Sequence, residues 1–305
     1  MPLFIASIGE CMVELSDAGA GLWRSGFAGD TFNTLWSLRA VLPAAGCDFV
    51  SAFGDDPFSD RMRAFMVDAG IGTGGSPIIC GGTTGVYAIT LDGAERSFTY
   101  WRSNSAARRL ADDPDGLRKS LEGRRLAHFS GITMAILEDG GRGMLLDSLA
   151  EARRAGTIIS FDPNWRSRLW ASQDAARSVL AAAAAIADIV LPSFSDEAEV
   201  FGDASPSATV ERFAAQGARE VVVKDGSAST TLLVDGRPVR IPVPPADAVD
   251  TTGAGDAFNA GYLAARLQGT NPIEAVERAH RVAAVAIGAK GALAPAPDLR
   301  EAFEG

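Results

Sequence analysis

Histidine is scarce in this 305-residue chain, which contains only His128 and His280. Two histidines so far apart argue against a histidine-based catalytic triad and against a histidine-rich metal site. The three cysteines, Cys11, Cys47 and Cys80, are odd in number and lack the spacing of a metal site. Scattered free thiols suit a reducing compartment, so the composition predicts a cytoplasmic protein.

Basic residues are also fewer than acidic ones, with 28 lysines and arginines and 38 aspartates and glutamates. Nucleic acids and anionic membranes select basic surfaces, so neither is an expected partner. The chain has no run of about 18 apolar residues, the length that a transmembrane helix needs. Its first ten residues lack the basic segment of a signal peptide and are typical of a first strand.

Two familiar nucleotide-binding motifs are missing as well. The pattern G-x-x-x-x-G-K-[ST] does not occur, which excludes a P-loop enzyme. No G-x-G-x-x-G supports a dinucleotide site. A nucleotide-dependent activity would therefore need another way of holding phosphate.

What the chain does have is length and apolar content, with 47% hydrophobic residues, enough for one large domain spanning residues 1–305. From residue 126 onward, short apolar runs alternate with helical patterns. This spacing predicts a mainly parallel sheet with helices on both faces, an α/β fold. The expected strands cover residues 3–8, 49–54, 126–129, 158–161, 189–191 and 221–223. The expected helices cover residues 35–40, 60–69, 143–154, 175–186, 208–216, 257–267, 273–287 and 299–303.

Two expected hairpins do not follow this strand–helix alternation. Residues 85–91 and 96–101 alternate in polarity around the turn residues 92–95, which indicates a small sheet outside the main one. Residues 11–15 also alternate and are a candidate strand on a different surface. A second hairpin is expected at residues 230–234 and 238–243, around Asp235 and Gly236.

The most informative stretch is residues 250–256, D-T-T-G-A-G-D, which lies between an extended proline-rich approach and a helical pattern. Its glycines lie at a helix N-terminus, where free N–H groups and the helix dipole bind anions such as phosphate. We expect the amides from Gly253 to Asp256, including Ala254 and Gly255, to stabilise a transferred phosphoryl group, with the Asp256 carboxylate as the base. Gly253 and Gly255 would therefore also contact the nucleotide. The simpler alternative is that Asp256 only caps the helix.

Three further stretches could contact a ligand. Asp30 and Asn33 follow a glycine-bearing turn and would face a polyhydroxy ligand, unless they merely cap a helix. Residues 161–166, F-D-P-N-W-R, follow a strand whose carboxyl end should open onto the ligand crevice, although an exposed polar loop is the alternative. Arg102 ends the first hairpin, and together with Arg166 it suits a carboxylate better than a neutral sugar, because guanidinium groups bind carboxylates as a planar fork.

The heptapeptide at residues 250–256 resembles the C-terminal signature of the ribokinase, or phosphofructokinase B, family of carbohydrate kinases, D-T-x-G-A-G-D. Residues 28–33 resemble the family's G-G-x-x-x-N element, with Ala28 in place of the first glycine. The resemblance implies a ribokinase-like three-layer α/β/α sandwich with a small β lid formed by roughly residues 11–28 and 84–102. The family's lid covers the sugar and often pairs with the lid of another subunit, so a homo-oligomer built through the lid is expected.

Residues 9–15, 95–103 and 161–170 look like the 2-keto-3-deoxygluconate kinase branch of this family. This resemblance implies ATP-dependent phosphorylation of 2-dehydro-3-deoxy-D-gluconate at its 6-hydroxyl. It implies that four side chains contact the sugar acid: Tyr87, Tyr100, Arg102 and Arg166. Gly29 and Asn33 would contact its hydroxyls. A kinase of a neutral sugar, such as fructose or ribose, and an inactive sugar-binding regulator on the same scaffold remain alternatives.

The resemblance also implies a nucleotide side of the site, with ATP and Mg²⁺ as expected cofactors. Lys224 and Gly226 belong to a V-K-x-G stretch that lies beside the ATP phosphates and ribose in the family. Ser193 and Asp196 stand where relatives have N-x-x-E near magnesium, so the metal ligands stay open. Small residues around Ala283 could leave an adenine slot, although helix packing also explains them. Asp250 could help to bind a monovalent cation.

Overall fold

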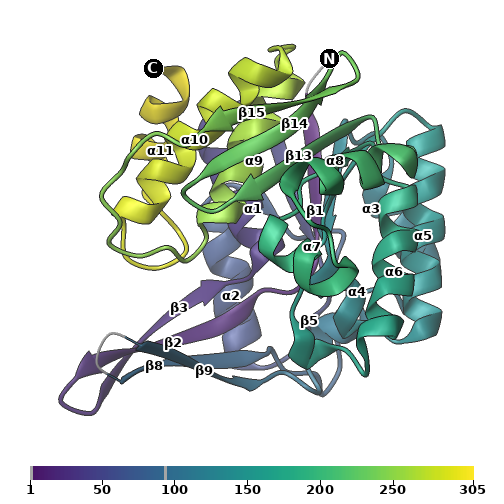
Figure 1. Ribbon diagram of the computed structural model, residues 1–305. Coiled ribbons are helices and arrows are strands. Elements are labelled where there is room, and N and C mark those ends of the chain that lie inside the picture. The colour runs from purple at the N-terminus through teal and green to yellow at the C-terminus, as the bar shows by residue number, and fades with distance from the viewer. Residues whose placement is uncertain (1–2, 93–94) are drawn as a thin grey trace.

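The computed structural model describes residues 3–92 and 95–305. Within these residues, the strands form a nine-stranded main sheet and two smaller sheets (Figure 1). In spatial order, the main sheet contains β15 (Arg237–Pro242), β14 (Ser229–Val234), β13 (Glu220–Asp225), β12 (Ile189–Val190), β11 (Ile158–Asp162), β10 (Leu126–Ser130), β1 (Phe4–Ile8), β4 (Gly46–Val50) and β6 (Ile71–Gly72). The pairs from β13 to β6 are parallel, whereas β14 and β15 add an antiparallel edge.

Side chains on both faces of the main sheet are buried, as expected for parallel strands covered on both sides. Within β1, Ile5 belongs to one apolar core, and Ala6 and Ile8 belong to the other. In β10, Leu126 and Phe129 divide between the two cores in the same way. This alternation follows from the period of two in a strand and explains why the strands read as continuous apolar runs.

Helices cover both faces of the main sheet, which confirms the predicted three-layer fold (Figure 1). One core includes residues of α1 (Asp30–Val41), α2 (Pro57–Asp68), α9 (Ala254–Leu267), α10 (Pro272–Gly288) and α11 (Ala296–Glu304). The other core includes residues of α3 (Pro114–Leu121), α4 (Gly131–Ile136), α5 (Asp139–Arg154), α6 (Gln173–Ala185), α7 (Phe194–Phe201) and α8 (Pro206–Ala215). In the part of the chain that the structure describes, none of these helices has the length and apolar content to cross a bilayer.

Three helices and several boundaries differ from the sequence prediction: α1 begins at Asp30 instead of residue 35, and α5 begins at Asp139 instead of residue 143. The helices α3, α4 and α7 were not expected, because they have only eight, six and eight residues and so give a weak periodic pattern. The helix expected to begin at residue 60 instead begins at Pro57, where the Asp56 side chain caps the backbone N–H groups of Phe58 and Ser59. Asp–Pro pairs of this kind are helix start signals, so local chemistry decides where the helix begins.

A four-stranded sheet projects from the main layers (Figure 1). Its strand order is β3 (Leu22–Ala28), β2 (Met12–Gly19), β8 (Val86–Asp92) and β9 (Glu95–Trp101). The strands β8 and β9 form the expected hairpin, and the turn residues 93–94 lie outside the described residues. The strands β2 and β8 pair in parallel, so two hairpins distant in sequence join along this pair. The hairpin expected near residues 235–236 is also present, as β14 and β15 at the edge of the main sheet.

The strand expected at residues 49–54 is divided in two. β4 ends at Val50, and β5 (Phe53–Gly54) pairs with β7 (Ile78–Ile79) in a separate two-stranded sheet. The division arises because Ser51 donates its N–H to the Ser76 hydroxyl (2.9 Å), while Phe53 donates to the Pro77 carbonyl (2.9 Å). Two short 3₁₀ helices, Ala106–Arg109 and Ser167–Leu169, complete the described elements.

Candidate active site

A cavity of about 990 Å³ lies between the carboxyl ends of the main-sheet strands and the four-stranded sheet. Its wall includes Asp162 at the end of β11, Ser193 after β12 and Lys224 near the end of β13. The first turns of α1 and α9 close another side, and residues of β2, β8 and β9 face them. Ligands of open parallel sheets bind at this edge, because the strands end there and the loops diverge.

The N-terminus of α9 forms one end of the cavity. Gly253 is the N-cap and has φ of 76°, a left-handed conformation that favours glycine. A Cβ atom at Gly253 would also lie only 2.8 Å from the carbonyl oxygen of Ala292. The Ala254 N–H donates to the Thr251 carbonyl (3.3 Å) and is therefore partly engaged. The N–H groups of Gly255 and Asp256 follow in the first turn, where helices offer anion-binding donors.

The side chain of Asp256 is held by an asparagine from α1. Asn33 donates its Nδ2 to Asp256 Oδ2 (2.8 Å), and its Oδ1 accepts the N–H of Gly29 (3.3 Å). Burial and, after it, the charge of Asp30 raise the pKa of Asp256 to about 7, although the Asn33 hydrogen bond opposes this rise. The carboxylate is thus oriented and has the proton affinity of a base that works near neutral pH.

Gly29 and Asp30 bring the start of α1 close to the base. A Cβ atom at Gly29 would overlap the carbonyl oxygen of Glu10, so only glycine permits this approach. Asp30 Oδ2 accepts a hydrogen bond from Nδ2 of Asn164 (2.7 Å), which has a φ of 36°. The two predicted hydroxyl-facing residues, Asp30 and Asn33, therefore lie on the same cavity wall as Asp256.

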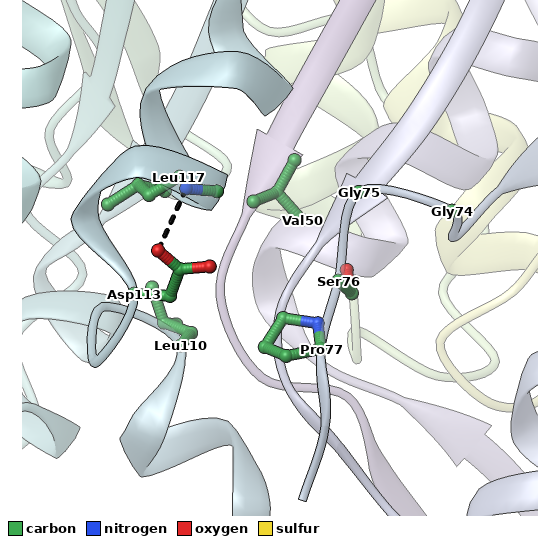
Figure 2. A pocket seen from close by; sticks show the side chains of 9 residues that line it. Val50, Gly74, Gly75, Ser76, Pro77, Leu110, Asp113 and Leu117 are labelled. Atoms are coloured by element: carbon green, nitrogen blue, oxygen red, sulfur yellow. Dashed lines mark hydrogen bonds between the residues drawn. The ribbon is translucent and has the colours of Figure 1, made fainter.

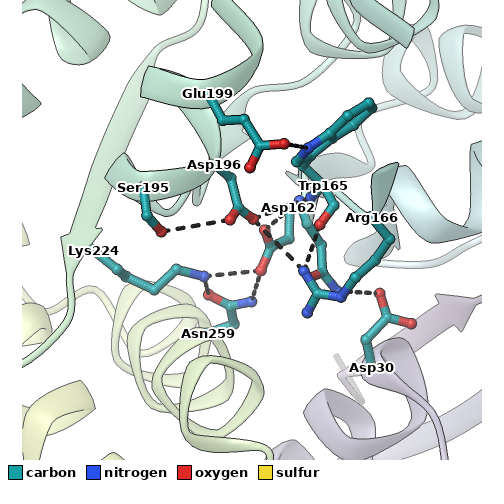
Figure 3. A network of polar contacts seen from close by, with 10 residues as sticks. Asp30, Asp162, Trp165, Arg166, Ser195, Asp196, Glu199, Lys224 and Asn259 are labelled. Atoms are coloured by element: carbon teal, nitrogen blue, oxygen red, sulfur yellow. Dashed lines mark hydrogen bonds and ion pairs between the residues drawn. The ribbon is translucent and has the colours of Figure 1, made fainter. Parts of the chain in front are cut away.

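A polar network crosses the floor of the cavity (Figure 3). Lys224 donates from Nζ to Asp162 Oδ2 (2.8 Å) and to Asn259 Oδ1 (2.9 Å). Asn259 in turn donates from Nδ2 to the same Asp162 oxygen (2.7 Å). Burial would raise the pKa of Asp162, but the charge of Lys224 and these hydrogen bonds outweigh it and lower the pKa, so the carboxylate is ionised at neutral pH.

The two arginines expected to bind a carboxylate both line the cavity, but their surroundings differ. Arg102 forms an ion pair with Glu10, and the two side chains are only 10% and 1% exposed. Arg166 is 53% exposed, and its Nη1 lies 3.8 Å from Asp196 Oδ2. The charge of Arg102 is thus already compensated by a buried partner, whereas Arg166 is only weakly paired and its guanidinium is available to a ligand.

The two tyrosines lie on β8 and β9 and stack on each other, with ring centroids 5.7 Å apart. Tyr87 is buried and donates its hydroxyl to Glu14, its cross-strand neighbour on β2. Burial and the charge of Glu14 raise the pKa of Tyr87, so its hydroxyl stays protonated. Tyr100 is 42% exposed and lines the cavity. Together they form an aromatic part of the cavity wall.

The residues expected on the nucleotide side are only partly brought together. Ser193, Lys224, Gly253 and Gly255 line the cavity, but Gly226 and Ala283 are outside its lining. Ala283 packs against the core beneath α10, in agreement with the alternative of helix packing. Asp250 is buried and accepts the N–H groups of Thr252 (2.9 Å) and Gly291 (3.0 Å).

Several carboxylates line the cavity, but they are not grouped around one point. Within residues 3–92 and 95–305, no group of three or more histidine, cysteine, aspartate or glutamate side chains is arranged to hold a metal ion. Asp196 lines the cavity one turn after Ser193, while the neighbouring Glu197 is buried against Arg212. A magnesium ion bound to nucleotide phosphates needs only one or two protein carboxylates, and a cavity lined by Asp196 meets that need.

Four residues of this arrangement were not singled out from the sequence: Glu10, Glu14, Asn259 and, as the partner of Arg166, Asp196. A partial signal existed for Asn259, because it follows Asp256 by three positions and therefore shares its helix face. Glu10 carried no such signal, since its partner Arg102 lies in another part of the chain.

A second, smaller hollow of about 210 Å³ lies between the loop at residues 74–77 and the start of α3 (Figure 2). The only charged side chain in its lining is Asp113, which is the N-cap of α3 and accepts the N–H of Gly116 (3.0 Å). This carboxylate is engaged in capping the helix, so the hollow is a weaker candidate for a reaction site than the larger cavity.

The fold and the cavity define an α/β protein suited to phosphoryl transfer, with an anion-binding helix N-terminus beside a buried carboxylate. Residues 3–299 match the model of the pfkB family of carbohydrate kinases, and the chain belongs to this family. It is 37% identical to 2-dehydro-3-deoxygluconokinase of Dickeya dadantii over 300 residues, 95% of this chain and 96% of that protein. It is 36% identical to the enzyme of the same name from Escherichia coli K12, over 95% of this chain and 97% of that protein.

Solved structures agree with the fold. A candidate ribokinase II from Escherichia coli, solved in complex with ATP and Mg²⁺, superposes with a TM-score of 0.86 at 21% identity. The superposition covers 100% of this chain and 99% of that structure. This likeness confirms the expected ribokinase-like architecture.

Proposed function

We propose that this protein is an ATP-dependent kinase that phosphorylates 2-dehydro-3-deoxy-D-gluconate at its 6-hydroxyl. The observation that carries the proposal is a single cavity that combines the Asp256 carboxylate at the N-terminus of α9 with the exposed guanidinium of Arg166. The first feature suits phosphoryl transfer to a hydroxyl, and the second suits an acceptor with a carboxylate. The names of the two relatives at 37% and 36% identity support the same substrate.

In the proposed reaction, the 6-hydroxyl oxygen of the sugar acid forms a bond to the γ-phosphorus of ATP. The bond between that phosphorus and the bridging oxygen of ADP breaks, and the hydroxyl proton passes to Asp256. Asn33 orients the Asp256 carboxylate, because its amide occupies one of the two carboxylate oxygens. The other oxygen is left to accept the proton.

The negative charge of the transferred group would meet the N–H groups of Gly255 and Asp256, with the partly engaged Ala254 amide and Gly253 at the same turn. Lys224 would add a cationic donor on the same side. When bound with ATP, Mg²⁺ neutralises phosphate charge, and Ser193 and Asp196 are the residues that would hold it. A monovalent cation beside Asp250, and roles for Gly226 and Ala283 toward the nucleotide, remain predictions.

The four-stranded sheet formed by β3, β2, β8 and β9 would act as the lid over the sugar acid. Tyr87 and Tyr100 would pack on its carbon chain, and Gly29, Asp30 and Asn33 would meet its hydroxyls. Arg166 would bind the carboxylate directly. Arg102 would contribute from its ion pair with Glu10, so its share of carboxylate binding is smaller than that of Arg166.

The test is ADP release measured over a panel of acceptors with and without a C1 carboxylate, including the keto-deoxy acid, its C4 epimer, fructose and ribose. The purified Asp256→Asn variant serves as the control for contaminating kinases. We expect the keto-deoxy acid to be phosphorylated with the highest kcat/KM. Preference for a neutral ketose would contradict the sugar-acid assignment, and no turnover of any acceptor would favour an inactive sugar-binding protein.

A further inference from the structure

The hydrogen-bonded triangle of Asp162, Lys224 and Asn259 joins three elements that are far apart in the sequence (Figure 3). Asp162 ends β11, Lys224 belongs to β13, and Asn259 lies in the second turn of α9. Asn259 is fully buried, and the Lys224 and Asp162 side chains are 11% and 8% exposed. All three mutual contacts are within 2.7–2.9 Å, so the triangle is closed.

The ammonium group of Lys224 has three N–H donors, and the triangle uses two of them. Its position relative to α9 follows from Gly255, where an added Cβ atom would lie 3.8 Å from Lys224 Nζ. The ammonium therefore sits against the first turn of α9, beside the amides that would hold the phosphoryl group. The third donor is available to an anion bound at that turn.

Asp162 is itself held on both oxygens. Its Oδ2 accepts from Lys224 and Asn259, and its Oδ1 accepts the backbone N–H of Asn164 (3.1 Å). A carboxylate with this many donors cannot rotate without losing several hydrogen bonds. It therefore provides a rigid anchor for the lysine.

An anchor is needed because a lysine side chain is long and flexible, and other carboxylates line the same cavity. An ammonium released from Asp162 and Asn259 could pair with Asp256 or Asp196. An ion pair with Asp256 would prevent it from accepting the hydroxyl proton, and an ion pair with Asp196 would compete with metal binding. The triangle prevents this collapse by satisfying two of the three lysine donors elsewhere.

We infer that Asp162 and Asn259 are positioning residues that hold the Lys224 ammonium at the first turn of α9, with its third N–H directed at the phosphoryl group in transfer. The inference rests on the proposed phosphotransferase function and adds two residues that act through Lys224. The competing explanation is that the triangle only ties β11, β13 and α9 together.

The two explanations differ in a double-mutant cycle. Asn259→Leu keeps the branching and the number of heavy atoms of the side chain but removes both of its hydrogen bonds, and Lys224→Met removes the ammonium. We expect Lys224→Met to lower kcat by at least about 10²-fold, the usual loss for one transition-state donor. We expect Asn259→Leu to lower kcat by about 10- to 100-fold, with KM for the sugar acid changed less than about twofold.

The decisive measurement is kcat of the double variant. If Asn259 acts through Lys224, the double variant is no slower than Lys224→Met, because residues that act as one unit are not additive. Losses that multiply in the double variant would overturn the inference. An Asn259→Leu variant with unchanged kcat and a lower Tm would also overturn it and would favour the structural explanation.

Tyr262→Phe provides the matched control, because Tyr262 is also buried on α9 and donates its hydroxyl to Glu220 (2.7 Å), outside the cavity lining. It should lower Tm without lowering kcat. If Asn259→Leu does not fold, Asn259→Ala at the same position and Asp162→Asn test the same cycle. The wild type, assayed in parallel on the keto-deoxy acid and on fructose, shows separately whether the proposed function holds, and the cycle is then run on the better acceptor.

Discussion

The ionisation of Asp256 leads to a sharp prediction about pH. As the proposed base, Asp256 must be deprotonated before the sugar hydroxyl can lose its proton. Its carboxylate is buried and lies near Asp30, and the two effects raise its pKa from 3.8 to about 7. The groups that face it from neighbouring elements are Asp30 and Asn33 on α1, Asp162 at the end of β11 and Lys224 on β13.

The magnitude follows from this pKa. Because kcat/KM for the sugar acid reports on the enzyme before the sugar binds, it should fall below pH 7 by about tenfold per pH unit and level off above. At pH 5 the loss should be about 100-fold. Replacing Asp256 by Asn should abolish this limb and lower kcat by at least about 10²-fold, the lower end for loss of a general base.

The Asp30→Asn variant tests whether the neighbouring charge raises the pKa of Asp256. The charge of Asp30 is the largest cause after burial of the raised pKa of Asp256, so its removal should move the acid limb to lower pH. ATP and Mg²⁺ also titrate in this range, but they are the same in both assays and cannot produce a shift between variants. Asp139→Asn, on an exposed side chain of α5, is the matched control and should leave the midpoint unchanged.

The assay is ADP release at saturating ATP from pH 5 to 9, with circular dichroism at each pH to confirm folding. A flat profile from pH 5 to 8 would refute the assignment of Asp256 as a base with a raised pKa. A limb that keeps its midpoint in Asp30→Asn would refute the role given to Asp30.

Three further predictions concern the sugar acid, the ion pair of Arg102 with Glu10, and the assembly. Arg166→Ala should cost about 2–4 kcal/mol of transition-state binding with the keto-deoxy acid, roughly 30- to 1000-fold in kcat/KM, and far less with a neutral ketose; equal losses on both acceptors would contradict carboxylate binding. Arg102→Ala should also lower the unfolding free energy by about 3–5 kcal/mol, because it leaves Glu10 buried without its partner, whereas an unchanged Tm would show that the pair is not structural. The exposed Trp23 (48%) and Trp101 (58%) on the four-stranded sheet predict a homodimer or higher oligomer through the lid. Light scattering at micromolar concentration should show it, Trp101→Glu should weaken it, and a wild-type monomer would contradict it.

The sequence did not determine which aromatic residues of the lid face the ligand. Phe98, Tyr100 and Trp101 are close together in the chain, and each could face either a ligand or another subunit. The strand β9 divides them, because Phe98 and Tyr100 line the cavity and Trp101 does not. The alternation was readable from the sequence, but which face met the ligand depended on how the small sheet packs over the main one.

Residues 250–256 were sufficient to predict the main features of the candidate site, because their chemistry is local. Glycines at a turn followed by a helical pattern produce an anion-binding helix N-terminus, and Asp256 lies in that first turn wherever the helix packs. The parallel sheet was predictable for a similar reason, since the period of the apolar residues reports the local element and its two-sided burial.

Only the tertiary structure determined which charged side chains are paired within the protein and which are available to a ligand. Arg102 and Arg166 look equivalent in the sequence, yet one is paired with buried Glu10 and the other is half exposed. Asn259 and Asp162 are 97 residues apart and meet only because α9 packs across the ends of the strands. Such contacts depend on the relative placement of distant elements, which no short stretch of sequence specifies, because burial and pairing are properties of the packed whole.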